Sequence, residues 1–288
     1  MDLISNALQI MIGGDVELIS RADWNALTPA QKQAKGLVAI QDNSTGYERG
    51  ILVNGADYVQ KNRYIPNSVE DDVLCEAYVS NFDATATSWG NGDVPIQYMS
   101  PSNKPTLDTT ENAVLAAAYS SGVVPYVDLG SAQQSFTAYA VIRQSASFST
   151  YARLLSCVYT RSASGGIVLH NNGNEVVVSK WGDELRTGIT ANQYFVAVIR
   201  NENTSPSTNT TDVYLYNGSE GSIVVKKTEE PSNIGRYFTV ARTDIDSNTQ
   251  FAEPSDVYVK YLAVVSGVES ESTIGLNMQN IYNEFLAE

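Results

Sequence analysis

The chain has 288 residues, of which 43% are hydrophobic and only 17% charged, and its formal net charge is −14 at pH 7. A chain this acidic repels phosphate backbones, and no basic cluster interrupts the acidity, so we do not expect nucleic-acid binding. No apolar run approaches the roughly 20 residues of a membrane-spanning helix. The 17 tyrosines and 20 glycines, with frequent valine and isoleucine, favour a globular, β-rich protein over a disordered one.

Residues 1–65 are predicted to form a small α+β module. Thr28 is a suitable helix N-cap, Pro29 suits the first helical position, and Gln31 completes a capping box. Two short strands are expected after this helix, at 37–40 and 51–53. Nearer the start, five apolar residues recur at helical spacing and need a surface to pack on: Leu3, Ile4, Ala7, Leu8 and Met11.

Residues 66–71 have the composition of a linker, and almost everything in 72–288 is strand and turn. A long loop is expected from Ser80 to about Thr110, because glycine and proline recur there. Asn172-Gly173 and Asn217-Gly218 indicate hairpin turns. The strands are expected at 73–79, 136–143, 153–160, 166–170, 175–179, 194–200, 212–216, 222–226, 237–241 and 257–265. This density of short strands predicts a two-sheet sandwich or jelly roll.

The last residues return to a helical period. Ile274, Met278, Ile281 and Phe285 lie at i, i+4, i+7 and i+11, which places them along one apolar stripe. We therefore expect a C-terminal helix that closes the sandwich.

The order of features after residue 70 resembles the laminin-G-like, concanavalin-A-like jelly-roll family. The features are a strand at 73–78, the loop Trp89–Gly92, Val127–Gly130 before the strand at 136–141, the hairpin at 166–178, strands at 193–198 and 212–216, and a last strand leading into a helix. The resemblance implies a mainly β fold: a jelly-roll sandwich with a C-terminal helix behind the small α+β module.

The first region resembles the amino-terminal modules of tailed-phage head fibres and decoration proteins. The resemblance is carried by Trp24–Thr28, Gly36–Ile40 and Gly46–Gly50. It implies that residues 1–65 dock to a capsid and form an oligomer, with Trp24 and Leu27 joining the apolar stripe. The start of the sequence has no signal-peptide pattern, which fits assembly of virions in the host cytoplasm.

These resemblances favour a non-enzymatic virion protein, a head fibre or capsid decoration subunit. Its partners would be copies of itself, as a trimer, other virion proteins, and bacterial surface glycans held by the jelly roll. One alternative is a carbohydrate-binding module of a bacterial cell-surface protein. A second alternative is a glycan-cleaving enzyme.

The enzyme alternative needs acidic residues alternating on one strand, because alternation aims them into one cleft. The nearest pattern runs from Glu70 to Glu76, where the spacing is one residue too long, and it is interpreted as a solvated strand start. Asp183-Glu184 and Glu229-Glu230 are interpreted as loop charges. The only histidine, His170, flanks a turn and is interpreted as a surface residue. We therefore predict no catalytic residues.

Glycan binding requires exposed aromatic side chains and hydrogen-bonding groups. The candidates lie in predicted loops, with core packing as the alternative for each: Trp89, Asn91, Asp93, Tyr98 and Trp181.

Cofactors are not expected. A weak calcium pattern is present at Asp244, Asp246 and Asn248, but the glycine and glutamate of a complete EF-hand loop are missing. An Asx-turn is the alternative. Cys75 and Cys157 are expected to be buried free thiols.

Overall fold

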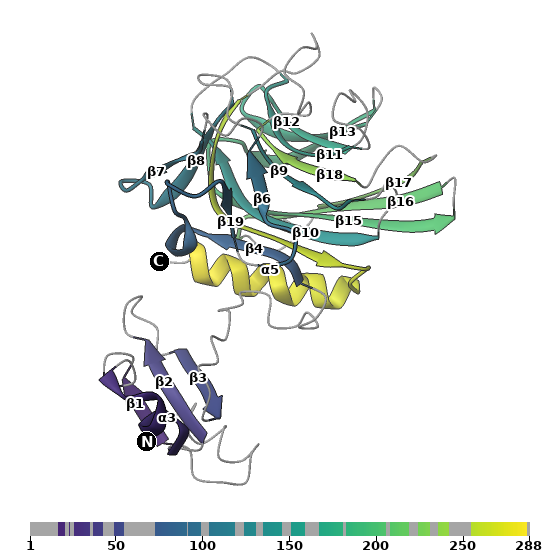
Figure 1. Ribbon diagram of the computed structural model, residues 1–288. Coiled ribbons are helices and arrows are strands. Elements are labelled where there is room, and N and C mark those ends of the chain that lie inside the picture. The colour runs from purple at the N-terminus through teal and green to yellow at the C-terminus, as the bar shows by residue number, and fades with distance from the viewer. Residues whose placement is uncertain are drawn as a thin grey trace. The chain divides into compact units, whose positions relative to one another are not determined.

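The computed structural model describes residues 17–20, 23, 26–34, 37–42, 49–54, 73–90, 92–98, 104–118, 124–130, 135–145, 151–158, 167–180, 183–205, 208–218, 224–230, 236–241 and 255–286. The chain divides into two compact units, Met1–Asn62 and Arg63–Glu288 (Figure 1). Each unit is described by itself.

The first unit contains a three-stranded sheet in the order β1-β2-β3. Strand β1 pairs in parallel with β2, which pairs in antiparallel fashion with β3. The elements are β1 (Glu17–Ser20), α3 (Pro29–Ala34), β2 (Leu37–Asp42) and β3 (Arg49–Asn54). The predicted capping box is present, because the backbone N–H of Gln31 donates to Thr28 Oγ1 at 3.3 Å and that of Thr28 donates to Gln31 Oε1 at 2.9 Å.

The residues predicted to dock lie mostly outside the described part of this unit. These are Leu3, Ile4, Ala7, Leu8, Met11 and Trp24. Leu27 is described, and it is half-buried. The docking prediction therefore remains a prediction.

The second unit is a sandwich of two eight-stranded sheets, as predicted, and every strand pairing described in it is antiparallel. One sheet, here called the helix-side sheet, has the order β17-β16-β15-β10-β19-β8-β7, with β4 also paired to β19. Its strands are β4 (Val73–Tyr78), β7 (Thr106–Asp108), β8 (Ala113–Ala117), β10 (Phe136–Gln144), β15 (Phe195–Ser205), β16 (Thr208–Tyr216), β17 (Val224–Glu230) and β19 (Asp256–Ser266).

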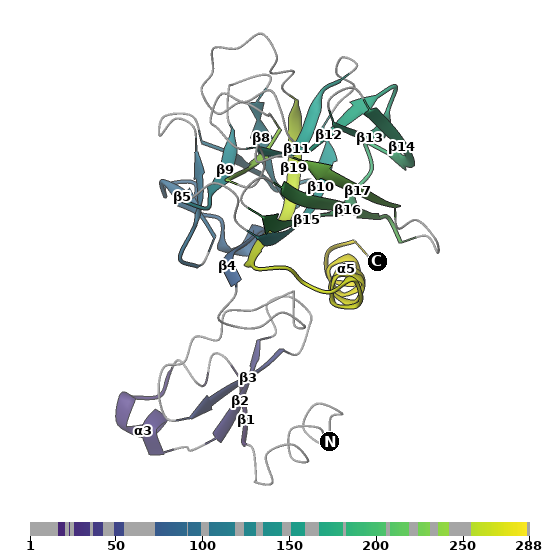
Figure 2. The same cartoon turned by 90° about the vertical axis from the view of Figure 1, so that its right-hand side faces the viewer.

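The other sheet, here called the opposite sheet, has the order β14-β13-β12-β11-β18-β9-β6-β5. Figure 2 shows the two sheets facing each other. The strands are β5 (Ser88–Trp89), β6 (Ile96–Tyr98), β9 (Pro125–Asp128), β11 (Arg153–Val158), β12 (Ile167–Asn172), β13 (Glu175–Lys180), β14 (Asp183–Thr190) and β18 (Tyr237–Val240).

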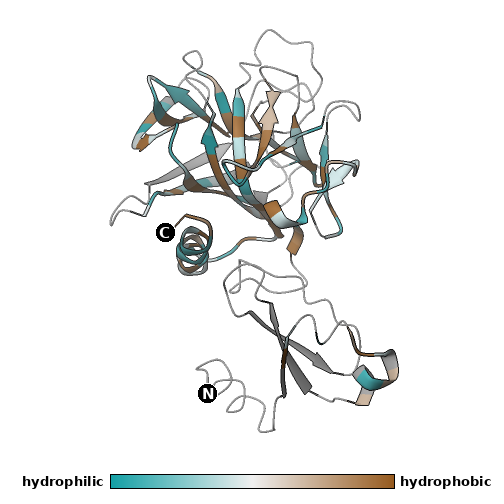
Figure 3. Cartoon of the chain, turned by 90° about the vertical axis from the view of Figure 1, so that its left-hand side faces the viewer, coloured by the Kyte–Doolittle hydropathy of each residue, from teal (hydrophilic) through white to brown (hydrophobic). Residues whose placement is uncertain are grey.

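Strand β10 shows how the sequence builds the core. Phe136, Ala138, Ala140 and Ile142 join the cluster between the sheets, and the alternate residues Tyr139 and Val141 join a second cluster on the outer face. This follows from the two-residue period of a strand. Because both faces are covered, the strand is a nearly continuous buried run, whereas other strands alternate hydrophilic and hydrophobic bands (Figure 3).

The second cluster is covered by the predicted C-terminal helix, α5 (Glu271–Phe285). Ser270 is its N-cap and accepts from the backbone N–H of Thr273 at 3.1 Å. Ile274, Met278 and Ile281 are buried against the helix-side sheet, which confirms the apolar stripe. Among the described residues, no helix is long and apolar enough to cross a membrane.

Three loop predictions were wrong, and one of them concerns Glu229 and Glu230, which end the strand β17. The segment 80–110 contains the turn η3 (Val79–Asn81) and the strands β5, β6 and β7. These strands have only two or three residues, so no periodicity can show them. Asp183 and Glu184, interpreted as loop charges, begin the eight-residue edge strand β14, where one side is free to carry charge.

Candidate functional site

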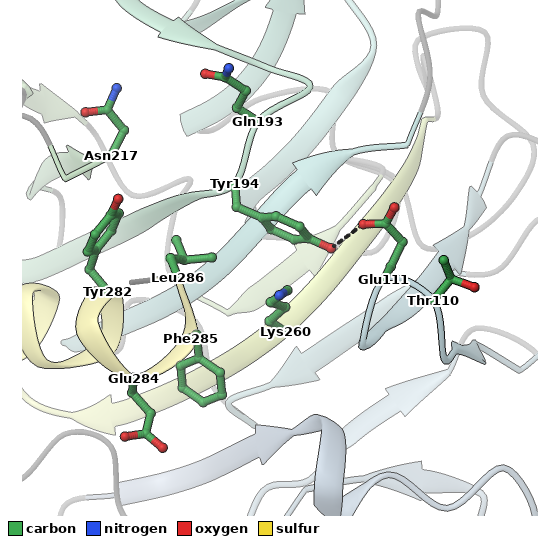
Figure 4. A pocket seen from close by; sticks show the side chains of 10 residues that line it. All are labelled: Thr110, Glu111, Gln193, Tyr194, Asn217, Lys260, Tyr282, Glu284, Phe285 and Leu286. Atoms are coloured by element: carbon green, nitrogen blue, oxygen red, sulfur yellow. Dashed lines mark hydrogen bonds between the residues drawn. The ribbon is translucent and has the colours of Figure 1, made fainter. Parts of the chain in front are cut away.

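A pocket of about 580 Å³ lies on the second unit, at the C-terminal end of α5. Figure 4 shows side chains from α5, from the start of β15, from β19 and from the turn before β8. The pocket is mostly polar, and it is lined by Thr110, Glu111, Gln193, Tyr194, Asn217, Lys260, Tyr282, Glu284, Phe285 and Leu286. Its volume is in the range of small-molecule sites.

Tyr194 lies at the centre of the pocket (Figure 4), and two cations lie close to its ring. The Lys260 ammonium is 4.7 Å from the centroid of its ring, and the Arg143 guanidinium is 5.2 Å away. Arg143 also lies 4.5 Å from the ring of Tyr258. Cations over aromatic faces are held by the ring quadrupole, so this row of side chains is ordered before any ligand arrives.

Glu111 fixes one side of this row. Its Oε2 lies 2.6 Å from the Arg143 guanidinium and accepts a 3.4 Å hydrogen bond from the Tyr194 hydroxyl (Figure 4). The neighbouring Asp108 accepts a 3.0 Å hydrogen bond from Tyr258. The Glu111 carboxylate is therefore committed to Arg143 and Tyr194.

Lys260 is the half-buried cation of the pocket. Burial lowers its pKa from the usual 10.5, and the nearby Glu111 carboxylate opposes this shift only in part. Burial likewise raises the pKa of the Tyr194 hydroxyl well above its usual 10, so Tyr194 stays a neutral donor.

The wall formed by α5 depends on a close backbone approach. The ring of Tyr282 meets that of Tyr216 edge to face, with centroids 5.1 Å apart. Gly218 in the adjoining turn has a φ of +87°, and a Cβ there would lie 2.2 Å from Tyr282 Oη. Only glycine combines a low-energy positive φ with the absence of a Cβ that would clash with Tyr282. The turn after β16 therefore sets the position of Tyr282.

These groups can bind a polar molecule. Amide side chains at Gln193 and Asn217 offer both donors and acceptors, while Tyr282 and Phe285 offer aromatic surface. Among the residues that the structure describes, no three metal-ligating side chains come together.

The sequence-based glycan candidates lie elsewhere. Trp89 is 2% exposed and Tyr98 is 7% exposed, so both pack in the core, as their alternative interpretation expected. The indole N–H of Trp89 donates to Asn81 Oδ1 at 2.9 Å. Their ring faces are not accessible to a sugar. Asp93 is exposed, while Asn91 and Trp181 lie outside the described residues.

Glu76 and His170 were expected at the surface, and both expectations were wrong. Glu76 is 2% exposed and His170 is fully buried. Glu76 lies on β4, on the face of the helix-side sheet that α5 covers. The Nε2 atom of His170 lies 3.8 Å from Oε1 of Glu184. Burial lowers the pKa of His170 below its usual 6.5, despite the attraction of Glu184.

The cysteine prediction is confirmed and the calcium prediction is untested. Cys75 and Cys157 are buried and free, and burial raises the pKa of the Cys75 thiol to about 12. Asp244, Asp246 and Asn248 lie outside the described residues.

Sequence reasoning missed the pocket. Tyr194 was assigned to a strand start, whereas β15 begins at Phe195. One signal was present, because Lys260 interrupts the otherwise uncharged run from Val257 to Val265. A lysine at the centre of an apolar strand is unusual and marks a position with a special environment.

When the chain is compared with known proteins, similarity is found in three-dimensional structure and not in sequence. No protein-family profile matches the chain, and no curated protein does. The structure is similar to the binding domain of botulinum neurotoxin DC in complex with SialylT (TM-score 0.45, 10% identity, 74% of this chain and 52% of that one). It is also similar to the botulinum neurotoxin serotype D binding domain (TM-score 0.47, 15% identity, 73% and 51%).

A third similar structure is a GH54 α-L-arabinofuranosidase mutant (TM-score 0.42, 11% identity, 60% of this chain and 41% of that one). The chain thus spans about half the length of the structures that it matches, or less. Identities this low say nothing about ligands. The class that the fold itself defines is an antiparallel β-sandwich with a C-terminal helix.

Proposed function

We propose that this chain is a non-enzymatic glycan-binding protein whose binding site is the pocket around Tyr194. The observation that carries the proposal is the composition of the pocket. Amides, an ammonium, a hydroxyl and aromatic edges converge on about 580 Å³ of mostly polar space. A ligand rich in hydroxyl groups can satisfy such a lining, whereas an apolar ligand would leave the polar groups unpaired.

The positions of the carboxylates in the pocket lining support ligand binding rather than hydrolysis. Glycosidases need two carboxyl groups on either side of the scissile bond. Of the two carboxylates in the lining, Glu111 is bound to Arg143 at 2.6 Å. The Glu284 side chain extends from the end of α5 away from Tyr194 and Glu111 (Figure 4). We propose that neither acts as an acid or nucleophile. Hydrolysis of a bound glycan that is abolished in Glu111→Gln would support the enzyme alternative.

The proposed setting is a phage virion, in which the protein is a head fibre or decoration subunit. The separate unit Met1–Asn62 ahead of the sandwich supports the layout of a docking module followed by an outward-facing domain. In this proposal the first unit contacts the capsid and two further copies of the chain. The alternative setting is the surface of a bacterium, with the sandwich as a carbohydrate-binding module.

Two measurements separate these settings. Mass spectrometry of purified virions from the source phage should detect the chain, and light scattering of the full chain should give the mass of a trimer. Detection in a bacterial envelope fraction and not in virions would favour the bacterial alternative.

The binding proposal is tested by screening an array of bacterial surface glycans and measuring the strongest ligand by calorimetry. Gln193→Ala removes an exposed amide of the pocket and should weaken binding at least fivefold. The matched control is Gln279→Ala on the exposed side of α5, which should leave binding unchanged. Equal affinities in the three proteins would overturn the pocket assignment.

A further inference from the structure

Two cations lie against the Tyr194 ring, Lys260 in the pocket lining and Arg143 behind it, and only Arg143 has a carboxylate partner. Arg143 is paired with Glu111 at 2.6 Å. Lys260 has the Tyr194 ring 4.7 Å from its Nζ, and no carboxylate of the described residues lies within ion-pair distance of it. The Lys260 ammonium is therefore the cation of the lining that can form an ion pair with a ligand.

Lys260 is placed where this charge is effective. It lies in the middle of β19, on a strand whose neighbouring residues Val259 and Tyr261 are buried. The Lys260 side chain is half-buried, and burial lowers its pKa, so its charge is partly desolvated without an ion pair. A partly desolvated charge interacts more strongly with an opposite charge than an exposed one does.

The surroundings limit the ligand to a single negative charge. Helix α5 ends at the pocket, where its last carbonyls carry partial negative charge, and its last turn has no basic residue. Glu284 adds a carboxylate at that end. A cluster of phosphate or sulfate esters would bring several negative charges against this repulsion with one ammonium to offset them, whereas the single charge of one carboxylate can be offset by Lys260.

We infer that the pocket selects an acidic saccharide, with the sugar carboxylate paired to Lys260. The inference rests on the proposed glycan binding and names the ligand class of the same site. The remaining hydroxyls then face Gln193 and Asn217 on the other side of Tyr194 (Figure 4). Uronic acids and sialic acids both carry this carboxylate, so the probes must distinguish them.

The test uses two pairs of probes: methyl galactopyranosiduronic acid with its methyl ester, and sialyllactose with lactose. In the first pair a single carboxylate is replaced by its uncharged methyl ester. Calorimetry on the full chain should show at least tenfold weaker binding of the neutral member in one of the two pairs, and the pair that shows it identifies the acid. In Lys260→Met the acid should bind no better than its neutral partner, whereas Lys260→Arg should keep the preference.

Lys104→Met is the control, because Lys104 donates to the backbone carbonyl of Thr85 and does not line the pocket. It should leave both affinities unchanged. Thermal melting of each variant verifies folding. Equal binding of acid and neutral probes, unaffected by Lys260→Met but lost in Gln193→Ala, would overturn the inference and leave glycan binding in place. Binding of no probe and no arrayed glycan would overturn both.

Discussion

The hydroxyl of Tyr261 donates a 2.8 Å hydrogen bond to Oε1 of Glu76, across 185 positions of sequence, and both side chains are buried. The bond joins β4 to β19. These two strands also pair along their backbones, from Tyr78 opposite Tyr261 to Val73 opposite Val265. The hydrogen bond lies on the helix-covered face of the sheet. Glu76 is therefore part of the packing beneath α5, and the carboxylate also raises the pKa of Tyr261, although burial is the larger cause.

Tyr261→Phe should destabilise the second unit by about 1–3 kcal/mol, because a buried carboxylate loses a hydrogen-bond donor. Tyr258→Phe is the control, since that hydroxyl donates to the half-buried Asp108. The control should cost less than about 0.5 kcal/mol. Urea unfolding measures both, and equal costs would contradict the structural role of the Glu76 bond.

Gly218→Ala should destabilise the protein and weaken ligand binding, because the new methyl group would displace Tyr282 from the pocket wall. Gly130→Ala is the control, since its φ of +80° is similar but nothing lies within 4 Å of the added Cβ. Both changes should cost about 1 kcal/mol for the backbone conformation. Gly218→Ala should cost about 1–3 kcal/mol more for overpacking, and this excess should fall in the Gly218→Ala, Tyr282→Ala double variant. Equal stability of the two single variants would refute the contact.

The fold was largely predictable from the sequence, and the pocket was not. Long strands such as β10 and β19, and the stripe of α5, carry a period that local sequence reveals. The strands β5 to β7 are too short to carry one. Tyr194 and Lys260 are 66 positions apart in the sequence, so only tertiary structure brings them together. Both interpretations of Trp89 stayed open in the sequence, because a tryptophan beside glycines has the same local pattern in a loop and in a core.

Stability should fall as the pH is lowered below about 6.5, because His170 is the only histidine and is buried. Its folded pKa is lowered by burial, so the unfolded chain, with a histidine pKa of about 6.5, binds more protons in this window. Unfolding is therefore favoured as the pH falls through it. Melting temperatures at half-unit pH steps should show this slope in the native chain and a smaller one in His170→Gln. Identical slopes would show that other groups cause it.

Binding of an acidic saccharide should weaken at alkaline pH, starting below the usual lysine pKa of 10.5, because burial lowers the pKa of Lys260. Arg143 acts in the same direction and Glu111 opposes it, and these are the charged groups that act on Lys260. The loss should occur as the pH rises through the lowered pKa, since the neutral amine no longer pairs with a carboxylate. Calorimetry from pH 7 to 10 measures it, and the neutral probe should bind equally over this range. A flat profile for the acid would contradict the role of Lys260.

The most direct test of the central claim is a crystal structure of the chain with its strongest arrayed glycan. We predict saccharide density in the pocket between Tyr194 and α5, with hydroxyls bonded to Gln193 or Asn217 and an acidic group beside Lys260. Saccharide bound elsewhere on the chain, with the Tyr194 pocket empty, would contradict the account.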